Sequence, residues 1–124
     1  MRIHPYHLLS VLAGLALPIS AWGQDADAGH KVFTSQCSAC HSVQAGRTIL
    51  GPSLAGIVGR TAGQEPGFHY SAANKASGLV WDQATLERYL TKPQSVVPHT
   101  TMTYQGEADA TKRADLIAYL ATLH

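Results

Sequence analysis

The chain has 124 residues, with nine Lys or Arg against eight Asp or Glu and a formal net charge of +1 at pH 7. This length predicts one small domain. The near-neutral balance argues against nucleic acid as a partner, because domains that bind nucleic acid carry a basic face.

Residues 1–23 have the composition of an export signal. A weakly basic start that contains Arg2 precedes an apolar run over residues 8–17, and the segment ends in the small-residue site Ala-Trp-Gly23. We predict cleavage after Gly23, a mature domain over residues 24–124 and a periplasmic location. The alternative is an uncleaved membrane anchor, although the apolar run is shorter than the roughly 20 residues that span a bilayer.

Four segments after the signal have the pattern of helices, and long loops separate them. We predict helices over about residues 26–36, 71–76, 82–90 and 110–123. Aspartates precede three of these segments as N-caps, Asp25 or Asp27 in the first, Asp82 in the third and Asp109 in the last. No segment has the alternation of a strand, so the predicted fold class is all-α.

The first and last of these helices contain the clearest apolar positions. Phe33 is the strongest core candidate of the first helix, and Gly29, one turn earlier, would permit a second helix to approach closely. The last helix has an apolar stripe at helical spacing, formed by Leu116, Tyr119, Leu120 and Leu123. Residues 47–70, by contrast, are rich in Gly and Pro and predict a long loop. A loop of this length in a small domain needs something to organise it.

Cys37-Ser-Ala-Cys40-His41 is the motif with the most specific chemistry in the chain. Cys-x-x-Cys-His is the pattern of covalent c-type haem attachment. Two thiols about one turn apart can each add to a vinyl group on one haem edge, and the next residue is then held beneath the ring. The motif therefore predicts one haem c, covalently attached through Cys37 and Cys40, with His41 as an axial ligand. A haem would also organise the long loop.

Three other uses of two cysteines at this spacing are open from the motif alone. A thioredoxin-like redox pair needs a βαβ context, which the surrounding sequence lacks. A zinc site needs further ligands at metal-binding spacing, and the chain has no third cysteine. A disulfide would leave the adjacent His41 without a role.

A second axial ligand has few candidates in the mature region. They are Met102, His30, His69, His99 and His124. Met102 follows a stretch with little helical character, Pro98-His-Thr-Thr, so it could extend from a loop toward the iron. Core packing is the alternative role of a single methionine.

A series of short motifs follows in order along the rest of the chain. They are Gly29-His-Lys-Val-Phe33, Gly51-Pro-Ser-Leu54, Gly59-Arg-Thr-Ala-Gly63, Pro66-Gly-Phe-His-Tyr-Ser-Ala-Ala-Asn-Lys75, Leu79-Val-Trp81, Leu86-Glu-Arg-Tyr-Leu90, Pro98-His-Thr-Thr-Met102 and Arg113-Ala-Asp-Leu-Ile-Ala-Tyr-Leu120. In this order and spacing the chain resembles class I cytochromes c of the mitochondrial and alphaproteobacterial type. The resemblance implies the cytochrome c fold, with a few short helices and long loops wrapped around one covalently bound haem.

The resemblance also implies the residues that contact the haem. His41 and Met102 match the axial ligands, and the carbonyl of Pro52 matches the acceptor that orients the histidine. Two further groups are implied by position. Arg60, Tyr70 and Trp81 match residues that hydrogen-bond the haem propionates, and Asn74, Tyr89 and Thr100 match a polar network on the methionine side.

The chain departs from the family pattern near the proposed methionine ligand. His99 and Thr101 replace the Gly and Lys of the usual Pro-Gly-Thr-Lys segment, and Tyr104 takes the place of an aromatic residue that packs against the exposed haem edge. Gln94, Ser95 and Thr101 stand where mitochondrial members have lysines. We therefore expect weaker electrostatic steering toward acidic partners.

Together these features predict a monomeric periplasmic electron-transfer protein that is not an enzyme. Redox proteins would dock transiently at the exposed haem edge, and the mature protein would have no membrane span. One alternative is a dedicated cytochrome subunit or tethered electron donor of a larger respiratory or dehydrogenase complex. Another is a haem peroxidase, which requires an open axial position.

Overall fold

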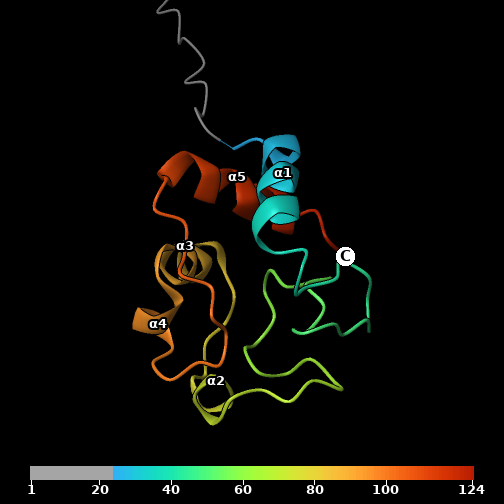
Figure 1. Cartoon of the computed structure of the whole chain (residues 1–124), viewed down its shortest axis with the longest axis vertical. Helices are drawn as coiled ribbons and strands as arrows, with labels where there is room; N and C mark the ends of the chain where they lie inside the picture. Colours follow the sequence, from blue (N-terminus) through green and yellow to red (C-terminus); the bar gives the residue numbers. More distant parts are fainter. Residues whose placement is uncertain (1–23) are drawn as a thin grey trace, which may run out of the picture.

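The structure is a computed structural model that describes residues 24–124, so the predicted signal segment lies outside the described residues. The described residues form five helices joined by loops (Figure 1). These are α1 (Ala26–Gln36), α2 (Ala72–Ala76), α3 (Gln83–Thr91), α4 (Pro93–Val96) and α5 (Ala110–Leu120). In this range β-pairing is limited to two isolated bridges, His41 with Thr48 and Thr61 with Val80. None of these helices is long and apolar enough to cross a membrane. The predicted all-α class is confirmed.

Side-chain caps start the helices where the sequence places capping residues. The Asp25 carboxylate accepts hydrogen bonds from two amides in the first turn of α1, so Asp25 rather than Asp27 is the cap. Asp82 and Asp109 accept in the same way at α3 and α5, and the Ser71 hydroxyl does so at α2. Each cap satisfies amides that have no partner inside the helix, which explains why the predicted starts are accurate.

Two features of the helices differ from the prediction. α4 is a single turn that begins at Pro93, a residue whose fixed φ suits the first helical position. The sequence analysis assigned no helix there, because one turn is too short to show periodicity. α5 ends at Leu120 rather than near residue 123, since the amide of Thr122 bonds the Tyr119 carbonyl in a tighter turn.

Helices α1 and α5 pack directly against each other. A Cβ placed on Gly29 would overlap the carbonyl oxygen of Asp115, so the two backbones are in contact at this point. The Asp115 carboxylate accepts a hydrogen bond from the Asp25 amide at 2.8 Å, and the Phe33 and Tyr119 rings lie 5.5 Å apart. The expected role of Gly29 in a close helix approach is confirmed.

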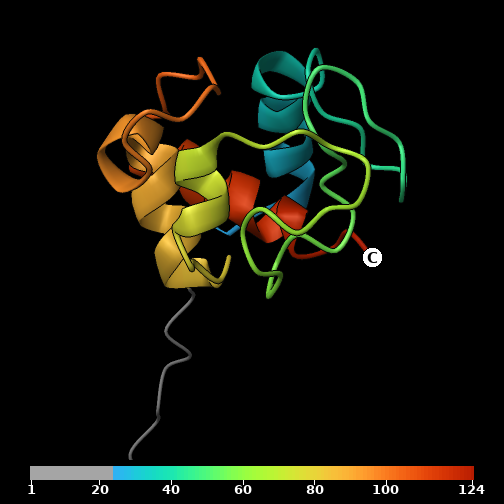
Figure 2. The same cartoon turned by 90° about the horizontal axis from the view of Figure 1, so that it is seen from below.

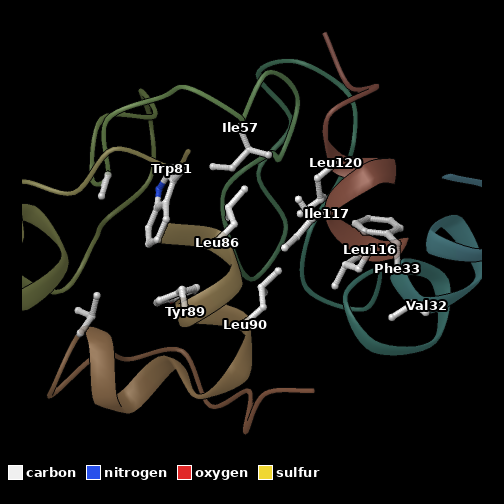
Figure 3. Close-up of a cluster of buried hydrophobic side chains, with 12 residues drawn as sticks. Val32, Phe33, Ile57, Trp81, Leu86, Tyr89, Leu90, Leu116, Ile117 and Leu120 are labelled. Atoms are coloured by element: carbon white, nitrogen blue, oxygen red, sulfur yellow. The ribbon is translucent and has the colours of Figure 1, made fainter. Parts of the chain in front are cut away.

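The other side of the molecule is built from α3, α4 and the long loop. Figures 1 and 2 show α3 and α4 on one side and the loop of residues 47–70 on the opposite side. Backbone hydrogen bonds attach the loop to the segment before α3, from Gly59 to Trp81, from Trp81 to Arg60 and from Ala62 to Leu79. Figure 3 shows the buried side chains that α1, α3, α5 and the loop direct inward. Many of these side chains line a cavity between the helices and the loop.

Candidate functional site

A cavity of about 530 Å³ lies between the helices and the long loop. Its size is in the range of cofactor sites, and its lining is mainly apolar. All eleven residues that the sequence analysis selected lie on its wall. They are Cys37, Cys40, His41, Pro52, Arg60, Tyr70, Asn74, Trp81, Tyr89, Thr100 and Met102.

The two cysteines lie in the turn that follows α1. The amides of Cys40 and His41 both bond the Cys37 carbonyl, at 3.1 and 2.9 Å, which winds the motif into one turn on the cavity wall. Both cysteines are free, Cys37 half-buried and Cys40 exposed. Burial, and secondly the neighbouring Cys40, raises the pKa of the Cys37 thiol to about 11. A catalytic redox pair and a zinc site both use thiolates, so this environment disfavours those two alternatives.

His41 is oriented by two contacts with the segment that follows the motif. Its Nδ1–H donates to the Pro52 carbonyl at 2.7 Å, since a carbonyl oxygen can only accept. A Cβ on Gly51 would lie 2.5 Å from the His41 ring, so the ring rests directly on the backbone. Burial lowers the pKa of His41. The imidazole is therefore neutral at pH 7, and its other nitrogen keeps the lone pair that a metal ligand needs.

Met102 reaches the cavity from the loop between α4 and α5. Its sulfur lies 3.8 Å from the Tyr89 hydroxyl, which donates to it. Its carbonyl accepts from the Gln94 side chain at 3.0 Å, and its amide donates to the Thr100 hydroxyl at 3.3 Å. Of the five candidates for the second ligand, only Met102 lines this cavity. His30, for example, stacks on Tyr119, with the ring centres 5.0 Å apart.

Arg60, on the polar part of the wall, forms an ion pair that the sequence analysis did not predict. Arg60 donates to the Glu65 carboxylate at 2.9 Å and to the carbonyls of Ser53 and Ala55. The side chains of Arg60 and Glu65 are only 18% and 14% exposed. The Tyr70 hydroxyl accepts from the Glu65 amide at 3.1 Å. No sequence signal identifies Glu65, because a pair within an irregular loop has no periodicity.

The residues on the wall fit a haem. Asn74 lines the cavity, and it has the one buried side-chain oxygen in the described chain that lacks a hydrogen-bond partner. The wall otherwise combines a broad apolar surface with two free thiols, an imidazole and a thioether. A flat apolar cofactor with polar edges and a metal at its centre satisfies each of these groups.

Two cavity residues outside the selected set are joined to each other. Gln36, the last residue of α1, accepts a hydrogen bond from the Tyr104 hydroxyl at 2.5 Å. Burial raises the pKa of Tyr104 to about 12. The sequence placed Tyr104 near the haem edge but did not indicate a partner for its hydroxyl.

Comparisons with known proteins agree with this site. The Cytochrome c family model matches residues 26–124. Cytochrome c2 of Rhodopila globiformis is 50% identical over 95 residues, which is 77% of this chain and 90% of that protein. Cytochrome c2 of Rhodoblastus acidophilus is 50% identical over 98 residues, 78% of this chain and 91% of that protein. Among solved structures, cytochrome cH from Methylobacterium extorquens matches with a TM-score of 0.74 and 45% identity, covering 79% of this chain and 98% of that one.

These matches identify the cavity as a haem pocket and account for the only two cysteines of the chain. The protein carries one haem c, attached through Cys37 and Cys40, and functions in electron transfer. Because the family match covers nearly all described residues, this chain belongs to the class I cytochromes c.

Proposed function

We propose that this cytochrome carries single electrons in the periplasm, with the haem iron held between His41 and Met102. One observation carries the proposal. The two side chains line the same cavity, and each is oriented by its own hydrogen bond, His41 to Pro52 and Met102 from Tyr89. The haem iron, when bound, supplies a one-electron couple. If His41 and Met102 both bind the iron, no position on it would be left for a substrate, which favours a carrier over an enzyme.

The residues around the cavity would keep the two oxidation states similar in structure. The hydrogen bonds that orient His41 and the Met102 sulfur would help both side chains keep their positions when the charge of the iron changes. The apolar wall excludes water and so favours the less charged, reduced state. Methionine ligation acts in the same direction.

The polar residues would hold the edges of the haem. We assign Arg60, Tyr70 and Trp81 to hydrogen bonds with the propionates, since buried carboxylates need donors. Asn74, Tyr89 and Thr100 form the polar network on the methionine side. The position of Asn74 on the cavity wall supports this assignment, since its side-chain oxygen has no hydrogen-bond partner elsewhere in the described chain.

Electrons would enter and leave where the cavity wall reaches the surface. Cys40, Leu50, Thr101 and Thr103 are exposed residues of the wall, and Leu50 is 75% exposed. These side chains are uncharged, which suits weak and transient docking of a monomer with other redox proteins.

Visible spectroscopy tests the ligands. We expect sharp low-spin bands in the reduced protein that remain after acidic acetone extraction, and a sulfur-to-iron charge-transfer band in the oxidised protein. Met102→Ala should remove the charge-transfer band, whereas His30→Ala, a control outside the cavity, should leave it unchanged. Identical spectra for Met102→Ala and the wild type would overturn the ligand assignment. Rapid peroxide turnover by the wild type would favour a peroxidase.

N-terminal sequencing tests export and cleavage. The protein recovered from the periplasm of a bacterial host that attaches c-type haem should begin at Gln24. An intact residue 1–23 segment in the membrane fraction would instead indicate a tethered donor.

A further inference from the structure

Three residues form a chain of hydrogen bonds beside the haem pocket, and we call this chain the polar clasp. The Tyr104 hydroxyl donates to the Gln36 side-chain oxygen at 2.5 Å. The Gln36 side-chain nitrogen donates to the Glu107 carboxylate at 2.6 Å. All three side chains are half-buried. The clasp thus joins the end of α1 to the segment between α4 and α5.

The donor and acceptor of each hydrogen bond in the clasp follow from the carboxylate of Glu107. The Glu107 carboxylate can only accept, so it fixes the Gln36 amide with its nitrogen toward Glu107 and its oxygen toward Tyr104. Hydrogen bonding from Gln36 lowers the pKa of Glu107, and burial raises that of Tyr104. Both shifts keep the acceptor ionised and the donor protonated near pH 7.

Glu107 is itself anchored to two helices. Its amide donates to the Leu90 carbonyl at 2.7 Å, and its carbonyl accepts from the Arg113 side chain at 2.8 Å. Its second carboxylate oxygen accepts from the Asp109 amide at 3.0 Å. The clasp therefore ends at a point that α3 and α5 hold in place.

The two other residues of the clasp adjoin the groups that contact the haem. Gln36 directly precedes Cys37, and Tyr104 lies two residues after Met102. Gln36 and Tyr104 both line the cavity. The hydrogen bonds of the Met102 backbone, to Gln94 and Thr100, stay within its own loop and helix α4. The clasp instead connects this loop to Gln36, on the side of the pocket where the cysteines attach the haem.

The loop that carries Met102 also contains a strained residue. Within the described chain, His99 is the one non-glycine residue in the left-handed region, with φ of 64°. This conformation disfavours an L-residue with a side chain. A strained loop persists only where surrounding contacts hold it, and the clasp residue Tyr104 lies five positions after His99 in the same loop.

We propose that the polar clasp holds the Met102 loop closed over the pocket and sets how often the methionine leaves the iron. Tyr104 is then a positioning residue that acts through Met102. This inference rests on the proposed His41–Met102 ligation. It adds that the hydroxyl of Tyr104, and not only its ring, controls access to the metal.

Binding of added imidazole to the oxidised holoprotein tests the clasp, since imidazole can enter only after Met102 has left. Tyr104→Phe keeps the ring and removes one hydrogen bond, so imidazole should bind about three- to tenfold faster and more tightly. Glu107→Ala should act in the same direction, and Glu107→Gln, which retains an acceptor for Gln36, should restore most of the wild-type rate. Tyr119→Phe is the matched control, because it removes a hydroxyl from a half-buried tyrosine outside the cavity.

A second measurement separates positioning from general stability. On heating, Tyr104→Phe should lose the sulfur-to-iron band well below the temperature at which far-UV circular dichroism reports unfolding. In the wild type the gap between the two temperatures should be smaller. If the band and the helical signal shifted together, the clasp would have only a structural role, and the proposal would be wrong.

The outcomes also separate this proposal from the ligand assignment. If Met102→Ala binds imidazole much faster than the wild type but Tyr104→Phe equals the wild type, the ligation stands and the clasp proposal fails. If Met102→Ala and the wild type bind imidazole at the same rate, the ligand assignment itself fails and the clasp proposal falls with it.

Discussion

Two regions of this cytochrome use buried apolar side chains in different ways. Between α1 and α5, Val32, Phe33 and Ile117 pack protein against protein, and the helices meet so closely that Gly29 has no room for a side chain. Around the hollow that the long loop, residues 81–90 and one face of α5 enclose, the buried residues line the haem pocket instead. They are Ile57, Trp81, Leu86, Tyr89, Leu90, Leu116 and Leu120. The first region has a core packed by protein side chains alone, whereas the core of the second region is filled only when the haem is bound.

The largest expected effect comes from removing the haem. Without the haem, a mainly apolar hollow of about 530 Å³ would lose the burial and contacts that the cofactor supplies, a large loss for a domain whose whole stability is on the order of 10 kcal/mol. Cys37→Ala/Cys40→Ala, purified without haem, should therefore unfold without a cooperative transition, with rapid hydrogen exchange in α3 and residues 47–70. Ser38→Ala in the same turn should remain folded. If the haem-free variant unfolded cooperatively at the same midpoint as the wild type, the pocket region would be stable without its cofactor.

Gly29→Ala tests the direct packing of α1 against α5. The added methyl group overlaps the Asp115 carbonyl and must push α1 from α5, so the free energy of unfolding should fall by about 3 kcal/mol. Lys31→Ala, on the exposed face of α1, should change it by less than about 0.5 kcal/mol. Denaturant titration of the holoprotein measures both. A wild-type stability for Gly29→Ala would mean that the helices tolerate a larger separation.

Two ion pairs allow the pocket and the rest of the protein to be compared through the reduction potential, with a smaller expected effect. Arg60 of the Arg60–Glu65 pair lines the pocket, whereas neither residue of the Arg113–Glu87 pair does. Glu65→Gln removes a negative charge that is paired with a residue of the haem pocket, which disfavours the oxidised state and should raise the reduction potential. We expect about a threefold change in the ratio of reduced to oxidised protein, or about 30 mV. Glu87→Gln removes the same charge and should shift the potential by less; equal shifts would contradict the distinction.

The smallest effect concerns the strained residue in the Met102 loop. His99→Gly relieves the strain of the left-handed conformation but adds freedom to the unfolded chain, so the net gain should be about 0.5 kcal/mol. Thr101→Gly, in the same loop without a positive φ, should instead lose stability. Thermal unfolding of the two holoproteins compares them, and a loss in both would indicate that His99 makes contacts that outweigh its strain.

Much of the fold followed from local patterns. The starts of α1, α3 and α5 were predicted because an aspartate cap acts on amides within its own first turn. The close approach at Gly29 was expected because one glycine on a helix face permits it, although only the structure shows that Asp115 is the neighbour. The single turn α4 was missed because its four residues have no period to recognise.

The sequence by itself determined the haem motif and its chemistry. Cys37, Cys40 and His41 meet within one turn, because hydrogen bonds between near neighbours wind that turn whatever the rest of the chain does. Tertiary structure decided which distant groups join them. Of the candidates for the second ligand, Met102 and none of the four histidines lines the pocket. The hydrogen bonds of the clasp link residues that lie 68 and 71 positions apart. No local pattern encodes such contacts, since they form only when the packing of α1 against α5 brings these distant segments together.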